Sequence, residues 1–138
     1  MSKATKIYES FNRAKTSVRY HLIFSTKFRR KCLDKIRDTV LNSFREVEKV
    51  SDFKILVMEL DKDHIHLLMK WKPHLSIEQV VRRLKQMTTK LIWNKEETYL
   101  RQFYWKDRKL WTGGYFCSTI GEVSEETIKK YIENYERI

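Results

Sequence analysis

Two apolar segments joined by a short polar turn are the feature that most constrains how this chain can fold. Residues 53–61 and 63–71 each have the length and the apolar content of a β-strand, and the turn between them lies around residues 61–63. Strands joined by so short a connection pair antiparallel, as a hairpin. The first strand is apolar on both faces at its middle, so we expect other parts of the chain to cover both sides of the sheet.

The second strand, DHIHLLMKW, contains two histidines that stand one residue apart. Successive side chains of a strand point to opposite faces. The apolar odd-numbered residues from Ile65 to Trp71 are therefore predicted to face the core, and His64 and His66 to lie side by side on the other face, within reach of one metal ion. By itself the spacing fits two half-exposed surface histidines equally well. The pair is a candidate metal site whose assignment depends on the rest of the chain.

Hydrophobic periodicity predicts the elements on either side of this hairpin. Residues 17–26 alternate as a strand. Residues 34–50 have the apolar stripe of a helix, for which Asp34 is the predicted N-cap. After the hairpin, Ser76 and Gln79 form a capping box, and apolar residues continue from there at helical spacing.

The C-terminal part of the chain completes the predicted fold. Residues 95–110 are expected to form a short helix and a basic loop, and LWTGGYFCSTIG an aromatic strand after a glycine turn. A last helix, with Ser124 as its N-cap, is predicted to run to the C-terminus, and residues 1–15 to form a mobile basic leader. The order β-α-β-β-α-β-α favours an α+β fold of the ferredoxin-like (RRM-like) kind, an antiparallel sheet packed with helices, in one domain over residues 1–138.

The charge of the chain indicates the class of its partner. Lysine and arginine number 29 against 18 acidic residues, a formal net charge of +11 in 138 residues. Such a surplus suits the phosphate backbone of a nucleic acid. An anionic membrane is the rival partner, although no basic amphipathic anchor stands out, and a basic protein without a charged partner is the third interpretation.

Two further features bear on where the protein works. No apolar run approaches the roughly 18 residues that a membrane span requires. The two cysteines, Cys32 and Cys117, are far apart and lack the spacing of a redox or zinc motif. We therefore expect free thiols in a cytoplasmic protein without a membrane partner.

Basic and aromatic side chains occur together in several segments. Aromatic rings can stack on bases while cations contact phosphates. The aromatic candidates for base stacking are Phe28, Tyr104, Trp105 and Trp111. The basic candidates for DNA contact are Lys27, Arg29, Arg30, Lys31, Arg82, Arg83, Lys106, Arg108 and Lys109. A charged outer helix face, such as the one that carries Arg82 and Arg83, is usually just solvated.

Three blocks of the sequence, DHIHLL, SIEQVVRRLK and LWTGGYFCSTIGEVSEETIKKYIENY, resemble the single-tyrosine HUH transposases of small insertion sequences. These are the TnpA-type enzymes of elements that move as single-stranded DNA. The similarity begins at YHLIFSTKFRRKCL and covers nearly the whole chain in the family's order. It implies a ferredoxin-like homodimer that binds the hairpin-bearing ends of an insertion sequence. It further implies that His64 and His66 hold a divalent ion, Mg2+ or Mn2+, and that Tyr131 on the last helix attacks DNA, leaving a 5′-phosphotyrosine and a free 3′-OH.

One position departs from the family's pattern. Members usually carry a metal-binding Gln four residues after the nucleophile, whereas this chain has Tyr135, and a neutral phenol is a poor ligand for a hard cation. Asn134, Asp61 and Asp63 are the candidates for a third ligand. Without the resemblance, periodicity alone would place Tyr131 in the packing stripe of the last helix.

Two functions therefore compete. The first is a DNA strand transferase that cleaves and rejoins insertion-sequence ends. The second is a basic RRM-like dimer that binds nucleic acid without cutting it, with a domesticated repeat-associated relative between the two. A covalent protein–DNA adduct separates them, and the sequence leaves open whether an active site is completed within one subunit or across a dimer.

Overall fold

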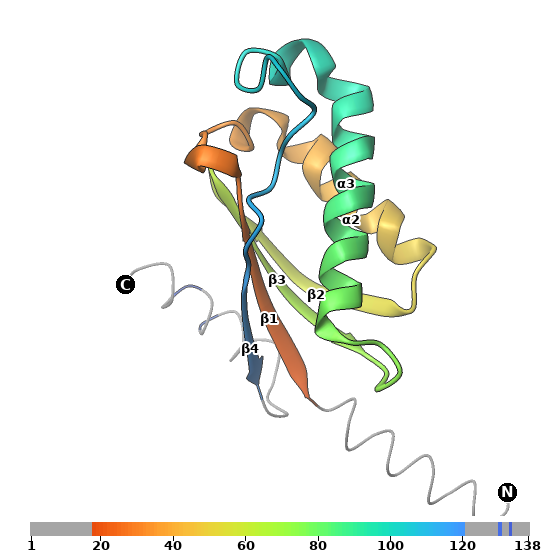
Figure 1. Cartoon of the computed structure of the whole chain (residues 1–138). Coiled ribbons are helices and arrows are strands. Elements are labelled where there is room, and N and C mark those ends of the chain that lie inside the picture. The colour runs from red at the N-terminus through yellow and green to blue at the C-terminus, as the bar shows by residue number, and fades with distance from the viewer. Residues whose placement is uncertain (1–17, 121–129, 131–132, 134–138) are drawn as a thin grey trace, which may run out of the picture.

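In the part of the chain that the structure describes, four antiparallel strands form one sheet, and two α-helices cover one of its faces (Figure 1). The computed structural model describes residues 18–120, together with residues 130 and 133. The elements in chain order are β1 (Arg19–Ser25), the short 3-10 helices η1 (Lys27–Arg29) and η2 (Asp34–Ile36), α2 (Arg37–Lys49), β2 (Phe53–Leu60), β3 (His64–Trp71), α3 (Ile77–Leu100) and β4 (Phe116–Ile120). The strand order β2-β3-β1-β4 is the ferredoxin-like arrangement that the sequence predicted.

The predicted hairpin is formed by β2 and β3. Its register pairs Leu60 with Ile65 next to the turn. The backbone N–H of Asp61 donates to the carbonyl of His64 over 2.9 Å and closes the turn. The hairpin therefore places the two predicted histidines at the start of a strand in the interior of the sheet, since β3 lies between β2 and β1.

A β-bulge explains why β2 is apolar on both faces. The register with β3 shifts between Ile55 and Val57, so that Val57 lies opposite Leu68. The extra residue turns Val57 toward the face that the helices do not cover. There Val57 and Leu68 form a small second core, packed against the partly buried Leu56. Both sides of the sheet thus bury apolar side chains, while α2 and α3, the described α-helices, cover one of them.

The main core lies between the sheet and the two helices. The odd-numbered residues of β3, from Ile65 to Trp71, all belong to it, as their alternation predicted. Because His64 and His66 alternate with these residues, they lie on the opposite face of the sheet. The largest fully buried side chains of this core are Leu22, Phe24, Leu33, Phe44, Ile65, Leu67, Met69, Leu84, Ile92, Trp93 and Leu100.

The start of α2 differs from the prediction. Asp34 is not the N-cap of an α-helix, because it lies in η2 and the α-helix begins at Arg37. The cause is packing: Leu33 and Ile36 are both buried, and the N–H of Ile36 donates to the carbonyl of Leu33 over 3.2 Å. The tighter 3-10 turn brings both side chains into the core before the regular helix begins.

Helix α3 begins where the capping box predicted, and its backbone kinks at Glu96. The hydroxyl of Ser76 accepts from the N–H of Gln79 over 3.1 Å, and the side chain of Gln79 accepts from the N–H of Ser76 over 2.9 Å. The backbone of Glu96 is not helical (φ −120°, ψ 32°), so a kink separates the main part of α3 from a short helical segment that ends at Leu100, close to the short helix predicted from residue 95. The buried Trp93 and Leu100 anchor the two parts in the core. The residues that follow it form the predicted basic loop.

Several predicted features lie outside the described residues. They are the leader over residues 1–15, the N-cap Ser124, the nucleophile Tyr131, and Asn134. Lys130 and Glu133, which are described, are helical. In the part of the chain that the structure describes, no helix is both long and apolar enough to cross a lipid bilayer. Cys32 and Cys117 are free thiols, as predicted.

Replacing Ser76 by alanine should lower the free energy of unfolding by about 1 kcal/mol, because it removes the acceptor of the capping box. Urea denaturation followed by far-UV circular dichroism measures the change. Gln86→Ala, at an exposed position of the same helix, is the control and should change stability by less than about 0.5 kcal/mol. A Ser76→Ala variant as stable as the wild type would contradict the capping role.

Candidate functional site

The pairing of β1 with β3 brings three histidines to the sheet face opposite α2 and α3. Ile23 lies opposite His66, and Ser25 lies opposite His64. Residues directly opposite each other share a face, and so does His21, two residues before Ile23. Nε2 of His21 and Nδ1 of His66 are 2.9 Å apart, a hydrogen bond between two buried rings.

Both rings of this histidine pair are neutral at neutral pH. Burial lowers the pKa of His21 to about 4. Burial, together with the neighbouring His21 and His64, lowers the pKa of His66 to about 4 as well. A neutral imidazole has one N–H donor and one acceptor nitrogen. Since the hydrogen bond with His21 engages Nδ1 of His66, metal binding by His66 would use Nε2.

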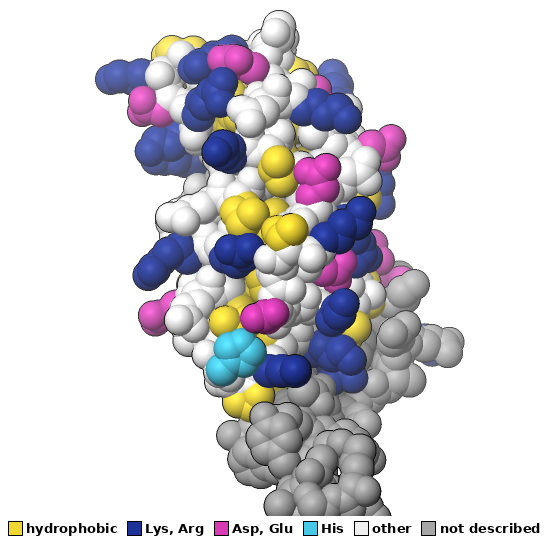
Figure 2. Space-filling model, turned by 90° about the vertical axis from the view of Figure 1, so that its right-hand side faces the viewer, with side chains coloured by type: hydrophobic (Ala, Val, Ile, Leu, Met, Phe, Trp, Pro, Cys, Tyr) yellow, Lys and Arg dark blue, Asp and Glu magenta, His cyan; other side chains and the backbone are white. Residues whose placement is uncertain are grey.

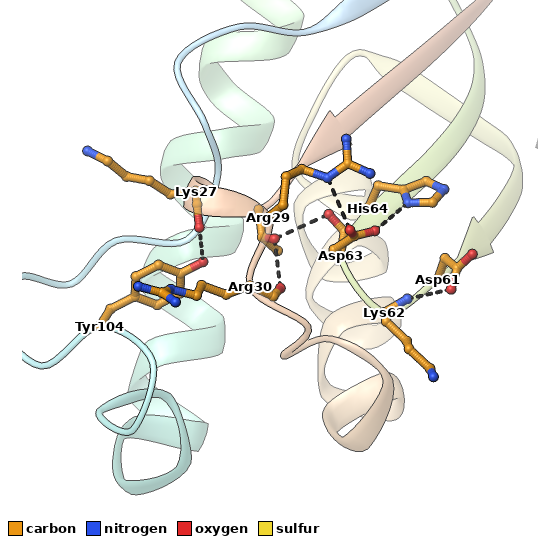
Figure 3. Close-up of polar contacts among 9 residues, drawn as sticks. Lys27, Arg29, Arg30, Asp61, Lys62, Asp63, His64 and Tyr104 are labelled. Atoms are coloured by element: carbon orange, nitrogen blue, oxygen red, sulfur yellow. Dashed lines mark hydrogen bonds and ion pairs between the residues drawn. The ribbon is translucent and has the colours of Figure 1, made fainter.

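Asp63 connects His64 to Arg29 (Figure 3). Its Oδ1 lies 2.8 Å from Nδ1 of His64, and its Oδ2 accepts from Nε of Arg29 over 3.1 Å. Partial burial works to raise the pKa of Asp63, but the hydrogen bonds from His64 and Arg29 outweigh it and hold that pKa below its ordinary value. A carboxylate hydrogen-bonded to a histidine fixes the orientation and tautomer of the ring. Asp63 therefore stands where it orients His64.

The two predicted metal ligands line an open pocket of about 460 Å³. The ring centroids of His64 and His66 are 5.0 Å apart. Arg29 lines the same pocket, and Thr112 with residues 114–116 forms part of its wall. A guanidinium next to two imidazoles suits the binding of an anionic group such as a phosphate.

Lys85 attaches this wall to the helix layer. Its Nζ donates to the carbonyls of Thr112 and Gly114 over 2.7 and 2.8 Å, and lies 5.7 Å from the ring centroid of Tyr115. Burial lowers the pKa of Lys85. Lys85 thus connects α3 to the segment that forms this wall of the histidine pocket.

The third metal ligand has no counterpart among the described residues. In that part of the chain, no three His, Cys, Asp or Glu side chains are arranged to hold a metal ion. Asp63 is turned toward His64 and Arg29, and the Oδ1 of Asp61 accepts from the N–H of Lys62 over 2.7 Å in the hairpin turn (Figure 3). His64 and His66 nevertheless fit a divalent ion as two of its ligands, because both have an oriented ring and His66 stays neutral.

The structure divides the predicted DNA-binding cations into three groups. Arg29 lies in the histidine pocket. Four others line a second pocket beside η1: Lys27, Arg30, Lys106 and Lys109. The remaining four line neither pocket: Lys31, Arg82, Arg83 and Arg108.

Two members of this last group have structural contacts. Arg83 donates to the carbonyl of Val50, after the end of α2, and Arg108 forms an ion pair with Glu97 at 3.2 Å. Figure 2 shows a side of the molecule on which Lys and Arg side chains are interspersed with Asp and Glu. Such mixed charge is typical of a solvated surface.

Two of the four aromatic candidates for base stacking are buried, and the other two are exposed. Tyr104 and Trp111 are 5% and 8% exposed and belong to the core, so the prediction that they stack on bases is wrong for the surface described here. Their polar atoms have partners inside the protein: the Trp111 N–H, for example, donates to Thr88 over 3.1 Å. Phe28 and Trp105 are each 71% exposed.

His21 and Lys85 were not among the site residues predicted from the sequence. The alternation of residues 17–26 already placed His21 on the face away from the core, which is the face predicted for His64 and His66. The missing information was the neighbour relation between β1 and β3, which the ferredoxin-like strand order supplies. Lys85 has no such signal, because its hydrogen bonds are to backbone carbonyls of a segment distant in sequence.

The chain belongs to the family of IS200-like transposases, whose family model matches residues 14–135. It is 28% identical over 116 residues to the ISDra2 transposase TnpA of Deinococcus radiodurans, covering 83% of this chain and 81% of that protein. It is 26% identical over 127 residues to the transposase for insertion sequence element IS200 of Salmonella typhimurium, covering 91% and 82%.

Solved structures share the fold. The crystal structure of a transposase-like protein from Deinococcus radiodurans has a TM-score of 0.66 and 28% identity, over 84% of this chain and 88% of that chain. A REP-associated tyrosine transposase bound to a REP hairpin has a TM-score of 0.53 and 9% identity, over 86% of this chain and 63% of that chain.

The free energy of unfolding should fall as the pH of a metal-free buffer is lowered from 6.5 to 4. An unfolded histidine takes up its proton near pH 6.5, whereas His21 and His66 in the folded protein do so only near pH 4. Between these values the unfolded chain binds more protons, so acidification favours unfolding, and the full contribution is present above pH 6.5. Since a tenfold difference in proton affinity is worth about 1.4 kcal/mol, the loss should be roughly a few kcal/mol.

Urea denaturation with EDTA at a series of pH values measures this dependence. His74→Gln removes an exposed histidine and should leave the profile unchanged. A stability that stays constant between pH 6.5 and 4 would show that folding does not lower the pKa of the two buried histidines.

Proposed function

We propose that this transposase cleaves and rejoins the single-stranded ends of its insertion sequence through a covalent link between Tyr131 and DNA. The observation that carries the proposal is the arrangement of His64 and His66. Their rings lie side by side in an open pocket that also contains Arg29, in a chain of the IS200-like family. Two imidazoles and a guanidinium in one pocket suit a metal-assisted reaction at a phosphate.

His64 and His66 would hold a divalent ion, Mg2+ or Mn2+. Such an ion draws charge from the oxygens of a phosphodiester and lowers the barrier to attack at phosphorus by several kcal/mol. The chain itself prepares the site, because Asp63 orients the ring of His64 and His21 orients the ring of His66, each through Nδ1. An oxygen donor would complete the ligand set. Asn134 and Asp61 are the remaining candidates, because both oxygens of Asp63 are already engaged.

In the proposed reaction the phenolic oxygen of Tyr131 gives up its proton and attacks the phosphorus of one phosphodiester. The bond from phosphorus to the 3′ oxygen of the preceding nucleotide breaks, and that oxygen takes up a proton and leaves as a free 3′-OH. The following nucleotide stays bound to Tyr131 as a 5′-phosphotyrosine. Attack by another 3′-OH reverses these steps and joins the DNA to a new end.

The proposed substrate is hairpin-bearing single-stranded DNA, bound by a homodimer. The net charge of +11 supports a polyanionic partner, and a structural neighbour is bound to a REP hairpin. The rival function, binding without cleavage, would use the same basic surface but would need no chemistry at Tyr131. A covalent adduct therefore decides between them.

Replacing Tyr131 by phenylalanine should abolish the covalent adduct and strand cleavage while leaving hairpin binding intact. The variant loses one hydroxyl and keeps the ring, so its melting temperature should barely change. Denaturing gel electrophoresis of a labelled single-stranded end incubated with Mn2+ measures the adduct. Tyr135→Phe is the matched control and should retain it. Adduct formed by Tyr131→Phe at the yield of the wild type would refute the assignment of the nucleophile.

Replacing His64 by alanine should weaken Mn2+ binding by at least about tenfold, the loss typical when a metal site is disturbed. Isothermal titration calorimetry on the metal-free protein measures the affinity, and the same gel assay should show no adduct. His64 is the better residue to replace, because His66→Ala would also remove the hydrogen-bond partner of the buried His21. His74→Ala is the control, and an unchanged Mn2+ affinity in His64→Ala would refute the metal site.

A further inference from the structure

A second pocket of about 260 Å³ lies beside η1 and the loop that follows α3. We call it the aromatic pocket, because the exposed rings of Phe28 and Trp105 line it together with four cations. The cations are Lys27, Arg30, Lys106 and Lys109, and Asp107 is the one acid in its lining. Nothing in the histidine site uses these side chains.

The rings of Phe28 and Trp105 are far more exposed than the aromatic side chains of the core. Phe28 and Trp105 are each 71% exposed, whereas Trp71, Trp93 and Trp111 are between 0% and 8% exposed. Large apolar side chains that face solvent next to polar groups mark interaction sites. Trp105 is therefore the tryptophan that can meet a ligand at the surface.

The backbone of η1 at Phe28 has a conformation that residues other than glycine rarely adopt. The φ angles of Phe28 and Arg29 are 60° and 53°, in the left-handed region. Both backbone polar groups of Lys27 are hydrogen-bonded. Its N–H donates to the carbonyl of Leu110 over 2.7 Å, and its carbonyl accepts from the hydroxyl of Tyr104 over 2.7 Å. Strain of this kind persists where the surrounding structure enforces it, and it gathers at functional sites.

Charge and ring geometry define the ligand. The Nζ of Lys27 lies 5.5 Å from the ring centroid of Phe28, and the guanidinium carbon of Arg30 lies 5.8 Å from it. A pocket with four cations and one acid attracts an anion, and its exposed rings offer flat apolar faces. An unpaired nucleotide has both matching parts, a planar base and flanking phosphates. The volume, slightly below the roughly 300–1,000 Å³ of ordinary small-molecule pockets, fits a single base.

We propose that the aromatic pocket binds one unpaired base of single-stranded DNA. The base stacks on Trp105 or Phe28, and the surrounding cations contact its phosphates. Aromatic stacking is tolerant of base identity, because every base has a flat face. The pocket is thus a second anchor for the strand, separate from the histidine pocket.

The position of η1 lets one strand reach both pockets. Figure 3 shows Lys27 and Tyr104 on one side of this turn and Asp63 with His64 on the other. Arg29 donates to Asp63, while its neighbours Phe28 and Arg30 line the aromatic pocket. This inference rests on the proposed function only in the choice of single-stranded DNA as the ligand.

The test measures binding of two fluorescein-labelled probes, a 20-nucleotide oligo(dT) and an abasic strand of the same length and charge, to the full chain. Trp105→Leu keeps apolar bulk but removes the flat ring. Because stacking of one base is worth about 5- to 150-fold in affinity, Trp105→Leu should bind oligo(dT) more weakly by a factor in this range. It should bind the abasic strand as the wild type does.

A matched variant and an optical signal complete the experiment. Trp105→Phe retains an aromatic ring and should keep the affinity for oligo(dT) within about fivefold of the wild type. Oligo(dT) should quench tryptophan emission in the wild type but much less in Trp105→Phe. Phe28→Leu should show the same selective loss on oligo(dT), with an unchanged melting temperature.

Several results would overturn the inference. They are an undiminished affinity of both leucine variants for oligo(dT), an equal loss on the abasic strand, or a dependence on Trp105 with oligo(rU) but not with oligo(dT).

The gel assay for the covalent adduct separates this inference from the proposed function. A wild type that forms the adduct, with leucine variants that bind oligo(dT) normally, refutes the pocket alone. A wild type without adduct whose oligo(dT) affinity depends on Trp105 refutes the cleavage alone.

Discussion

The antiparallel register between β1 and β3 is the constraint on which the histidine pocket depends. It places His21 beside His66 on one face, and it places Leu22 and Phe24 in the core on the other. A slip by one residue would exchange the two faces of a strand. Leu22 and Phe24 would then leave the core at a cost of about 1.5–3 kcal/mol each, and His21 would enter it without its partner. The apolar packing under the helices therefore fixes the geometry of the polar site on the far side of the sheet.

The segment that follows β1 is hydrogen-bonded to the turn of the β2–β3 hairpin, next to His64. The backbone N–H of Thr26 donates to the carbonyl of Asp63 over 2.8 Å, and the hydroxyl of Thr26 donates to the carbonyl of Arg30 over 2.8 Å. These bonds hold η1 against the turn of the hairpin, which is why Arg29 can reach Asp63. The hydroxyl of Thr26 thus bridges the two residues with a left-handed backbone, Phe28 and Arg29. The hydrogen bonds of Thr26 therefore affect both pockets, because η1 lies between them.

The parts of this structure that could be predicted from sequence are those set by local periodicity. Alternation placed His64 and His66 away from the core, and the spacing of Ser76 and Gln79 placed the start of α3. Features that depend on contacts between distant segments were not predictable in this way. The 3-10 turn at Asp34 follows from the burial of Leu33 and Ile36, and the hydrogen bond of His21 follows from the pairing of strands 45 residues apart. Composition likewise could not separate the buried Tyr104 and Trp111 from the exposed Phe28 and Trp105.

Neutral histidines inside a strongly basic chain are consistent with the electrostatics of a phosphate-binding site. Burial is the main reason that His21 and His66 have a pKa of about 4, and for His66 the nearby histidines act in the same direction. The cations that would attract DNA are instead exposed, on η1 and on the loop after α3. Exposed charges attract a polyanion over a distance of about 10 Å at moderate salt, whereas a buried charged ring would be costly. The chain thus separates the groups that attract the strand from those that would bind the metal, and Arg29, paired to Asp63, is the cation that lies between the two sets.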